Sequence, residues 1–423
     1  MTNEQLSLFS QEDSQDFFDR KRSWSASKHR LLLKFLQSFC YVLGGGKYPS
    51  KNLNYVDGFA GKGKYEKGIG ITNFTDQSSF WKRYNANFCD TDGSPLIALK
   101  CAKIFKEEGR VELKCHFSEA NKKSFSELEN NCKSFQDYVP YQLYGPGDFG
   151  NFLPKIINGL DGNPTLFFLD TFGVKGVSFD QVKMVNNYLR KHKGEVFLLF
   201  HNISVARHAG QSTAAAKNPR TQKAVETYTK NLTDLLGINS EPVWKAKWHE
   251  LQGQPQEFEK WALSFFKRRV LEETSIGGVT SFEIKESYYD VRPKYSIIVC
   301  SNKPDKSFGE LLNDFVFRER HSLFFRESYS GLEKFLEGEW QKEINQNAAY
   351  IKPYVLDCIQ KSNWSTVEET ITNTILKVGE LGLLDRSHYR KIILGLYDEG
   401  FLQARNLGRN GQPTGKTCIK IVS

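Results

Sequence analysis

The chain has 423 residues and a formal net charge of +9, with 39% hydrophobic and 13% aromatic residues. This length predicts two or three domains, and this apolar content excludes a chain too polar to form a packed core. The basic excess suits a polyanionic partner such as nucleic acid, although it is mild and also occurs in proteins that bind none.

The apolar runs and the cysteines indicate where the protein works. No apolar run reaches the roughly 18 residues of a membrane span, and the polar N-terminal residues are unlike a secretory signal. The eight cysteines are scattered, with no C-x-x-C pair and no cysteine and histidine at zinc spacing. We therefore expect a cytoplasmic protein with free thiols, no metal and no membrane partner.

Residues 1–24 are expected to form a flexible tail that carries a short motif. Residues 5–9 read Gln5-Leu6-Ser7-Leu8-Phe9, which resembles the peptide by which bacterial replication and repair proteins bind the sliding clamp. Leu8 and Phe9 would fill an apolar pocket of the clamp while Gln5 satisfies polar groups at its rim. The same peptide could instead be a staple that leads into the first helix.

The organising stretch of the chain is a short strand followed by a glycine-rich loop. An amphipathic helix over residues 27–43 comes first, and the three glycines that follow it predict its end. A strand at 53–57 then ends in an acid, Asp57, and a loop with three glycines follows at once: Gly58, Gly61 and Gly63. Glycines at such a turn let the backbone approach a ligand closely.

Strands alternate with helices over the first half of the chain. A helix with Ser94 as its N-cap runs to about residue 108, and its N-terminus suits a carboxylate or another anion. Further strands are predicted at 111–117, 141–144, 164–169 and 195–200, with helices between them. This alternation predicts a doubly wound parallel sheet. Residues 205–275 form a helical insertion, and strands at 279–286 and 294–300 complete seven strands.

Four successive strands are followed by a carboxylate. The four acids are Asp57, Glu119, Asp148 and Asp170. Ligands of such sheets bind beyond the carboxyl ends of the strands, so these acids predict a ligand site at one edge of the sheet. A divalent metal for hydrolysis is an alternative, but the acids lie on separate strand ends and no neighbouring histidine assists them.

A separate unit is predicted over residues 346–423, after a helical linker. Helices at 347–361, 365–378 and 386–398 precede strands at 401–405 and 416–422, which is the pattern of a winged helix-turn-helix. In such a domain the third helix enters the major groove and the wing contacts phosphate. The predicted nucleic-acid-binding residues are Arg386, His388, Arg390, Lys391, Arg405, Arg409 and Lys416. Winged helices also serve as protein docking modules, and that alternative stays open.

Together these motifs resemble those of the S-adenosylmethionine-dependent methyltransferases, and more closely those of the three-Cys-motif partner proteins. The matching stretches are Lys28-His29, Tyr55-Val56-Asp57-Gly58-Phe59-Ala60-Gly61-x-Gly63-x-Tyr65, Gly93-Ser94-Pro95-Leu96 and Leu169-Asp170-x-Phe172-Gly173. The resemblance covers residues 25–325 and, more loosely, the C-terminal unit. It implies a Rossmann-like methyltransferase domain, S-adenosylmethionine as cofactor and a three-Cys-motif protein as a partner.

The methyltransferase resemblance implies a role for each residue of the predicted site. Asp57 would receive the ammonium of the cofactor's methionine part, Glu119 the ribose hydroxyls, and Asp148 the adenine amino group. The glycine backbone would approach the methionine part, with Phe59 packed nearby. The implied cofactor-binding set is Asp57, Gly58, Phe59, Gly61, Gly63, Ser94, Glu119 and Asp148.

The implied catalytic residues are Asp170, Thr171 and Phe172. They stand where amino-methyltransferases of nucleic acids carry an acid or Asn, two prolines and an aromatic residue. There the acid accepts hydrogens from an exocyclic amine and the aromatic ring stacks on the extruded base. Here Thr171 replaces the first proline and Gly173 occupies the aromatic position, so Phe172 stacks only if the loop is shaped differently.

The leading hypothesis is a methyltransferase that acts on an amino group of a base in nucleic acid, with DNA favoured over RNA. A second is a non-catalytic DNA-binding adaptor of a phage-defence or mobile-element system, built on a degenerate methyltransferase fold. A third is a methyltransferase for a protein or small molecule, in which the C-terminal unit binds a partner.

Overall fold

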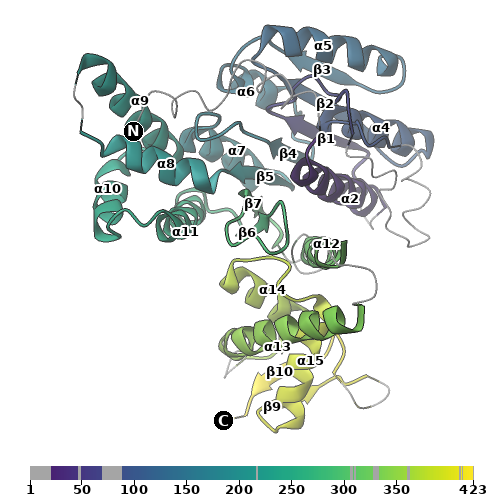
Figure 1. The fold of residues 1–423 in the computed structure, drawn as a ribbon. Coiled ribbons are helices and arrows are strands. Elements are labelled where there is room, and N and C mark those ends of the chain that lie inside the picture. The colour runs from purple at the N-terminus through teal and green to yellow at the C-terminus, as the bar shows by residue number, and fades with distance from the viewer. Residues whose placement is uncertain are drawn as a thin grey trace. The chain divides into compact units, whose positions relative to one another are not determined.

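The protein is a mixed α/β structure built around one seven-stranded sheet with the strand order β3-β2-β1-β4-β5-β7-β6. The computed structural model describes residues 21–45, 49–68, 88–215, 218–304, 308, 311–326, 333–359, 363–408, 411 and 413–422. The sheet is mostly parallel, as the alternation of strands and helices predicted, and its architecture is compatible with a Rossmann-like fold (Figure 1). The predicted number of strands is confirmed.

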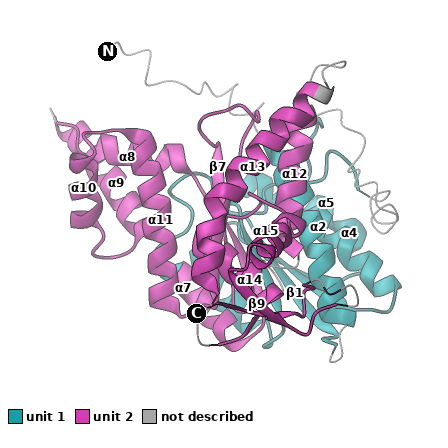
Figure 2. Ribbon diagram, turned by 90° about the horizontal axis from the view of Figure 1, so that it is seen from below, with its two compact units in different colours: residues 1–181 teal, residues 182–423 magenta. Residues whose placement is uncertain are grey.

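The chain divides into two compact units, Met1–Gln181 and Val182–Ser423, which Figure 2 colours separately. Unit 1 holds four strands: β1 (Asn52–Asp57), β2 (Glu112–Ser118), β3 (Tyr141–Tyr144) and β4 (Thr165–Leu169). β1 pairs in parallel with β2 and with β4, and β2 pairs in parallel with β3. The carboxyl ends of these four neighbouring strands therefore meet at one edge.

The register aligns the acids at that edge. Asp57 lies opposite Phe117 of β2 and Phe168 of β4. Glu119 comes two residues after Phe117, and Asp170 comes two residues after Phe168. The two acids therefore lie two residues beyond the level of Asp57, one on either side of β1. β1 and β4 are buried along almost their whole length, which is why apolar residues continue without alternation over Leu166–Leu169 of β4.

The helices of unit 1 follow the strands closely in sequence. They are α2 (Ser23–Gly45), α4 (Ser94–Glu107), α5 (Lys122–Cys132) with a 3-10 turn at Lys133–Phe135, and α6 (Phe149–Asn158). α2 begins at Ser23, inside the stretch predicted as a tail, and Lys21 just before it is buried. The predicted clamp-binding peptide, Gln5-Leu6-Ser7-Leu8-Phe9, lies outside the described residues.

One predicted helix cap is wrong. The N-cap of α4 is Gly93, in extended conformation, and Ser94 is the first helical residue. A Cβ at Gly93 would lie 2.7 Å from the carbonyl oxygen of Gly63, so only glycine fits where this cap packs on the glycine loop. The Ser94 hydroxyl is instead bonded to the Asp57 carboxylate.

Unit 2 contributes an antiparallel part of the sheet and the helical insertion. β5 (Gly194–Phe200) pairs antiparallel with β7 (Tyr295–Ser301), which pairs antiparallel with β6 (Gly278–Ile284). α7 (Phe179–Lys191) precedes β5. The predicted helical insertion is confirmed as four helices: α8 (Asn202–Ser212), α9 (Pro219–Leu236), α10 (Glu241–Glu250) and α11 (Pro255–Thr274).

The C-terminal part of unit 2 combines helices with a small sheet. Its helices are α12 (Asn313–Arg326), α13 (Glu333–Cys358), α14 (Val367–Val378) and α15 (Arg386–Asp398). Its strands are β8 (Ser365–Thr366), β9 (Leu402–Arg405) and β10 (Cys418–Ile421), arranged in the order β8-β10-β9. α13 begins well before the predicted 347, because no proline lies between residues 333 and 347 and Gly338 does not end the helix.

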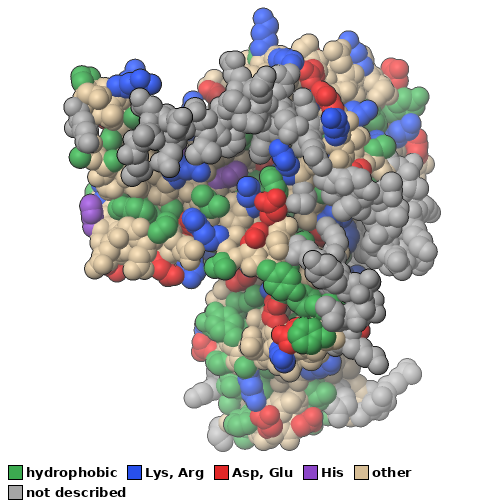
Figure 3. All heavy atoms as spheres, in the orientation of Figure 1, with side chains coloured by type: hydrophobic (Ala, Val, Ile, Leu, Met, Phe, Trp, Pro, Cys, Tyr) green, Lys and Arg blue, Asp and Glu red, His purple; other side chains and the backbone are tan. Residues whose placement is uncertain are grey.

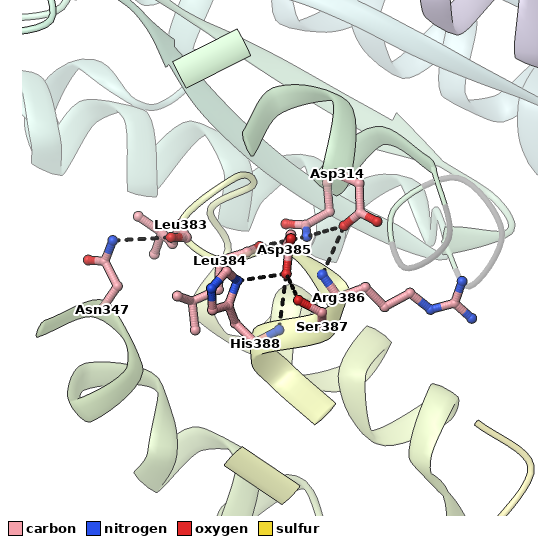
Figure 4. A network of polar contacts seen from close by, with 9 residues as sticks. Asp314, Asn347, Leu383, Leu384, Asp385, Arg386, Ser387 and His388 are labelled. Atoms are coloured by element: carbon pink, nitrogen blue, oxygen red, sulfur yellow. Dashed lines mark hydrogen bonds and ion pairs between the residues drawn. The ribbon is translucent and has the colours of Figure 1, made fainter. Parts of the chain in front are cut away.

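The turn between α14 and α15 is held by the rest of unit 2. The Asn313 side chain donates to the carbonyl of Leu384 (2.8 Å) and accepts from the amide of Gly382 (2.9 Å). The backbone of Ser281, in β6, exchanges two hydrogen bonds with residues 379 and 381. Figure 4 shows the neighbouring contacts of Asp314 and Asn347 with residues 383–388. This turn is therefore part of the packed unit.

None of the helices in the described ranges has the length and apolar character needed to cross a bilayer. All eight cysteines are free, and those at positions 40, 101, 115, 132 and 300 are buried. Burial raises the pKa of these five thiols and so keeps them in the neutral form.

Candidate functional site

The candidate site lies in unit 1, at the edge where β3, β2, β1 and β4 end. Asp57 is the last residue of β1 and is fully buried. Its Oδ1 accepts from the amide of Phe59 (3.1 Å), and its Oδ2 accepts from the hydroxyl of Tyr55 (3.4 Å). Three donors thus hold the carboxylate in a fixed orientation: the amide of Phe59 and the hydroxyls of Tyr55 and Ser94.

The electrostatic environment makes the Asp57 carboxylate unusually basic. Burial raises its pKa to about 7, against the hydrogen bonds from Ser94 and Phe59, which lower it. The neighbouring carboxylate of Asp170 raises this pKa further, and the ammonium of Lys28 lowers it. A cation that binds beside such a buried carboxylate strongly stabilises its ionised form.

The glycines of the loop after β1 serve different purposes. A Cβ at Gly58 would lie 2.9 Å from Leu169 and 3.1 Å from Phe149, so packing alone accounts for this glycine. Gly61 has φ +60, and the position of its Cβ has nothing within 4 Å. Gly63 has φ +80 and packs against α5 through Leu128. Only Gly61 combines a left-handed backbone with open space, as a close approach to a ligand requires.

The structure brings Glu119 to the glycine loop. Its Oε2 accepts from the amide of Gly61 (2.8 Å), and its Oε1 accepts from the amide of Asn121 (2.7 Å). Each carboxylate oxygen has two lone pairs, so each can accept one more hydrogen bond. Both oxygens are therefore held in place and still able to accept from a diol.

Asp148 and Phe59 complete the predicted cofactor-binding set. Asp148 is exposed, and although it is the N-cap residue of α6, its side chain makes no capping bond. Its carboxylate is thus not used in starting the helix. The Phe59 ring packs against Phe149, with ring centroids 5.6 Å apart. Phe59 is held on the side of α6, the helix that Asp148 precedes.

The main surprise at the site is the partner of Asp170. The Lys28 ammonium of α2 forms an ion pair with Asp170 Oδ2, and Lys28 is only 5% exposed. A signal for this residue is present in the sequence: Lys28 shares the apolar stripe of its helix with Leu32 and Phe35. A lysine on the buried face of an amphipathic helix needs a partner, and here that partner is the predicted catalytic acid.

Helix α2 is tied to the glycine loop by a second group of side chains. The rings of His29 and Tyr65 lie 6.1 Å apart between centroids, and the Lys21 ammonium lies 5.7 Å from the Tyr65 centroid. Lys21 also donates to the carbonyl of Asp92 (2.9 Å). Burial lowers the pKa of Lys21 to about 8, and that of His29 well below its usual value. The Lys28-His29 and Tyr65 motifs therefore meet in one place.

The residues after Asp170 form a tight turn. Thr171 is buried, and its hydroxyl donates to the carbonyl of Gly173 (3.3 Å). Gly173 has φ +79 with open space where its Cβ would lie. Phe172 is 67% exposed, which leaves most of its ring in contact with solvent. The turn thus buries the threonine and presents the aromatic ring.

The predicted nucleic-acid-binding residues of α15 are largely engaged within the protein. Arg386 and Arg390 both bind the carboxylate of Glu368, in α14, at 2.8 Å and 2.5 Å. His388 lies 2.6 Å from Asp385 Oδ1 (Figure 4). Figure 3 shows acidic, basic and hydrophobic side chains mixed over the described C-terminal part on the face it presents.

The remaining predicted cations are placed differently. Lys391 and Lys416 are exposed, and the Arg405 guanidinium lies 4.5 Å from the ring centroid of Trp364. Sequence reasoning missed this tryptophan and Lys420, whose ammonium lies 5.1 Å from the same ring. Arg409 lies outside the described residues.

Within the described ranges, no three His, Cys, Asp or Glu side chains gather in a way that could hold a metal ion. Asp57, Glu119 and Asp170 are instead distributed along the sheet edge, each with its own backbone or side-chain partner. Comparison of the chain with protein-family models and with curated protein sequences finds no match.

Proposed function

We propose that the chain binds S-adenosylmethionine at the strand ends of unit 1 and transfers its methyl group to an amino group of a base in nucleic acid. The observation that carries this proposal is that Asp57, Gly61 and Glu119 meet where the adjacent parallel strands β1 and β2 end. Asp57 offers a buried carboxylate for an ammonium, Glu119 offers two oriented acceptors for a diol, and Gly61 offers an open backbone. Asp57 and Gly61 would thus fit the methionine part of that cofactor, and Glu119 would fit its ribose.

When bound, this cofactor would supply a sulfonium methyl group that is already reactive: the amine nitrogen would take the methyl group, the C–S electron pair would stay on sulfur, and the amine would release one proton to water. The protein's task is then alignment. Asp170 lies next to Asp57 at the end of β4, where its free oxygen would accept a hydrogen from the amine. Phe172 presents a ring on which the base would stack.

Lys28 would position Asp170 for this task. Its ammonium binds one carboxylate oxygen, Oδ2, and so fixes the rotamer of the acid. The buried hydroxyl of Thr171, bonded to Gly173, would hold the turn that carries Phe172.

Transfer of a tritiated methyl group from S-adenosylmethionine to DNA or RNA tests the proposal. We expect label in nucleic acid with the wild type and at least a hundredfold less with Asp170→Asn, while that variant still binds the cofactor. Label in neither DNA nor RNA would contradict the proposed substrate.

The Lys28–Asp170 ion pair also supports a second candidate, the non-catalytic DNA-binding adaptor. An acid committed to a buried lysine is a structural element as well as an acceptor. In an adaptor, duplex DNA binding would survive both Asp57→Asn and Asp170→Asn, and no methyl transfer would be detected with any nucleic acid.

A further inference from the structure

The outer face of the small C-terminal sheet is distinct from the helix beside it. In the ladder between β9 and β10, Arg405 lies opposite Cys418 and Lys420 lies opposite Gln403. Directly opposed residues of antiparallel strands point to the same side, as do residues two apart, so all four share one face. The alternate residues on the other face are buried, namely Leu402 and Ile419. Arg405 and Lys420 therefore lie on the solvent side.

An aromatic ring brings these two cations together. Trp364, just before β8, has the Arg405 guanidinium 4.5 Å and the Lys420 ammonium 5.1 Å from its ring centroid. Cation–π contacts at such distances orient the two long side chains without consuming their hydrogen-bond donors. The N–H donors of Arg405 and Lys420 therefore remain able to bind an anionic group.

No acid of the strands offsets this charge. β8, β9 and β10 contain no Asp or Glu, and the sequence after Glu399 has none up to residue 423. The cations of that segment are Arg405, Arg409, Lys416 and Lys420. Two acids of the adjoining helix α14 lie beside this sheet: Glu369 Oε2 accepts from the amide of Thr366, and Glu368 Oε1 packs against Gly415 of the loop between β9 and β10. The segment is therefore a uniformly positive stretch of chain.

Helix α15 presents the opposite case. Glu368 receives both Arg386 and Arg390, and its backbone amide lies against Gly415 of the loop between β9 and β10. A phosphate group would have to displace this carboxylate to bind either arginine, at the cost of a charge-assisted hydrogen bond. The arginines therefore serve first to hold α15 to α14.

We propose that the outer face of β8-β10-β9, with Arg405 and Lys420 held over Trp364, is the phosphate-binding surface for duplex DNA, in place of the arginines of α15. This inference rests on the proposed nucleic-acid substrate. We assign the contacts of these two cations to phosphate and therefore expect them to be independent of base sequence. The surface would position the duplex, and base selection would belong elsewhere.

The salt dependence of duplex binding tests this surface. Fluorescence anisotropy of a labelled 24-base-pair duplex is measured with the full chain from 50 to 300 mM KCl. The slope of log K against log salt is negative, and each phosphate contact contributes roughly 0.9 to its magnitude. Arg405→Gln/Lys420→Gln should therefore reduce the magnitude of the slope by about 1.8 and weaken binding. Trp364→Leu keeps both cations and should weaken binding with less change of slope.

The matched control is Arg386→Gln/Arg390→Gln, which removes the same charge from α15. We expect it to leave the slope within 0.5 of the wild type. The proposal is overturned if Arg386→Gln/Arg390→Gln reduces the magnitude of the slope and Arg405→Gln/Lys420→Gln does not. It is also overturned if the wild type binds no duplex. Urea unfolding of both double variants separates lost binding from lost folding.

The outcome is independent of methyl transfer. If no label reaches nucleic acid but the sheet variant still loses duplex binding, the proposed activity fails and the surface stands. If label reaches DNA and the α15 variant alone loses duplex binding, the surface fails and the proposed activity stands.

Discussion

At the scale of single residues, Asp57 carries the most informative property of the site. Burial raises its pKa to about 7, whereas an unfolded aspartate titrates near 3.8. Between these two values the unfolded chain is ionised while the folded chain keeps the proton, so the free energy of unfolding falls as pH rises from about 4 to about 7. Above that window the empty site holds a buried negative charge that a cationic ligand would stabilise.

The affinity for S-adenosylmethionine should therefore depend on pH in a defined direction. Because the ionised Asp57 pairs with the ligand's ammonium, we expect the affinity to rise from pH 5.5 and to level off just above pH 7. Asp57→Asn should flatten this dependence and weaken binding at pH 8 by about 1.5–3 kcal/mol, the range for a hydrogen bond to a charged group. Isothermal titration at five pH values measures both. An affinity independent of pH in the wild type would refute this role for Asp57.

The Lys28–Asp170 pair makes a second prediction at this scale. Lys28→Met leaves the Asp170 carboxylate without its buried partner and should lower the free energy of unfolding by about 2–4 kcal/mol. Adding Asp170→Asn to Lys28→Met should restore part of that loss, which a double-mutant cycle in urea reports as a favourable coupling energy. Additive effects of the two substitutions would mean that the pair is not formed in solution.

At the scale of elements, two glycines with the same backbone geometry separate strain from ligand contact. Gly61 and Gly173 both have a left-handed φ and open space at the Cβ position. Alanine at either should cost about 1 kcal/mol of stability, from strain alone. Only Gly61→Ala should also weaken S-adenosylmethionine binding, by tenfold or more. Equal effects on binding would place the ligand away from the loop after β1.

The turn between α14 and α15 gives an element-scale prediction of stability. Asn313 satisfies a buried amide and a buried carbonyl of this turn, at Gly382 and Leu384. Asn313→Ala should leave both unpaired and cost about 2–4 kcal/mol. Asn347→Ala removes the bond to the carbonyl of Leu383 and one to the partly exposed side chain of Glu343, leaves one turn carbonyl unpaired, and is expected to cost about 1 kcal/mol. Urea unfolding compares the two, and an equal cost would mean that water replaces the lost bonds at Asn313.

The sequence predicted elements better than it predicted contacts. The four acids could be placed together because each follows a strand, and parallel strands end at one edge. The sequence marks Lys28 as part of a motif but does not predict its ion pair. Its partner Asp170 lies 142 residues away, and the packing of α2 decides which acid the lysine meets. Ser94 was misplaced as a cap, since the bond it makes instead, to Asp57, depends on tertiary packing. Likewise, nothing local marks Glu368 as the partner of Arg386 and Arg390.

At the scale of the whole molecule, the candidate ligand site and the positively charged sheet belong to different units. The four strand ends lie in Met1–Gln181, and the β8-β10-β9 sheet lies in Val182–Ser423. On the proposed function, cofactor chemistry would belong to one unit and duplex positioning to the other. It predicts that Asp57→Asn leaves duplex binding within threefold of the wild type, and that Arg405→Gln/Lys420→Gln leaves cofactor affinity within threefold. Anisotropy and titration on the two variants check this, and a loss of both functions in either variant would contradict it.

The central claim is that the rim of β3, β2, β1 and β4 holds a positively charged nucleoside. The most direct test is the shift of thermal unfolding with S-adenosylmethionine, measured on the wild type and on Asp57→Asn/Glu119→Gln. At a ligand concentration 100 times the dissociation constant, the wild type should gain about 2.7 kcal/mol and unfold at a higher temperature, while the double variant should show little shift. No shift in the wild type at millimolar ligand, or the same shift in both proteins, would contradict the account.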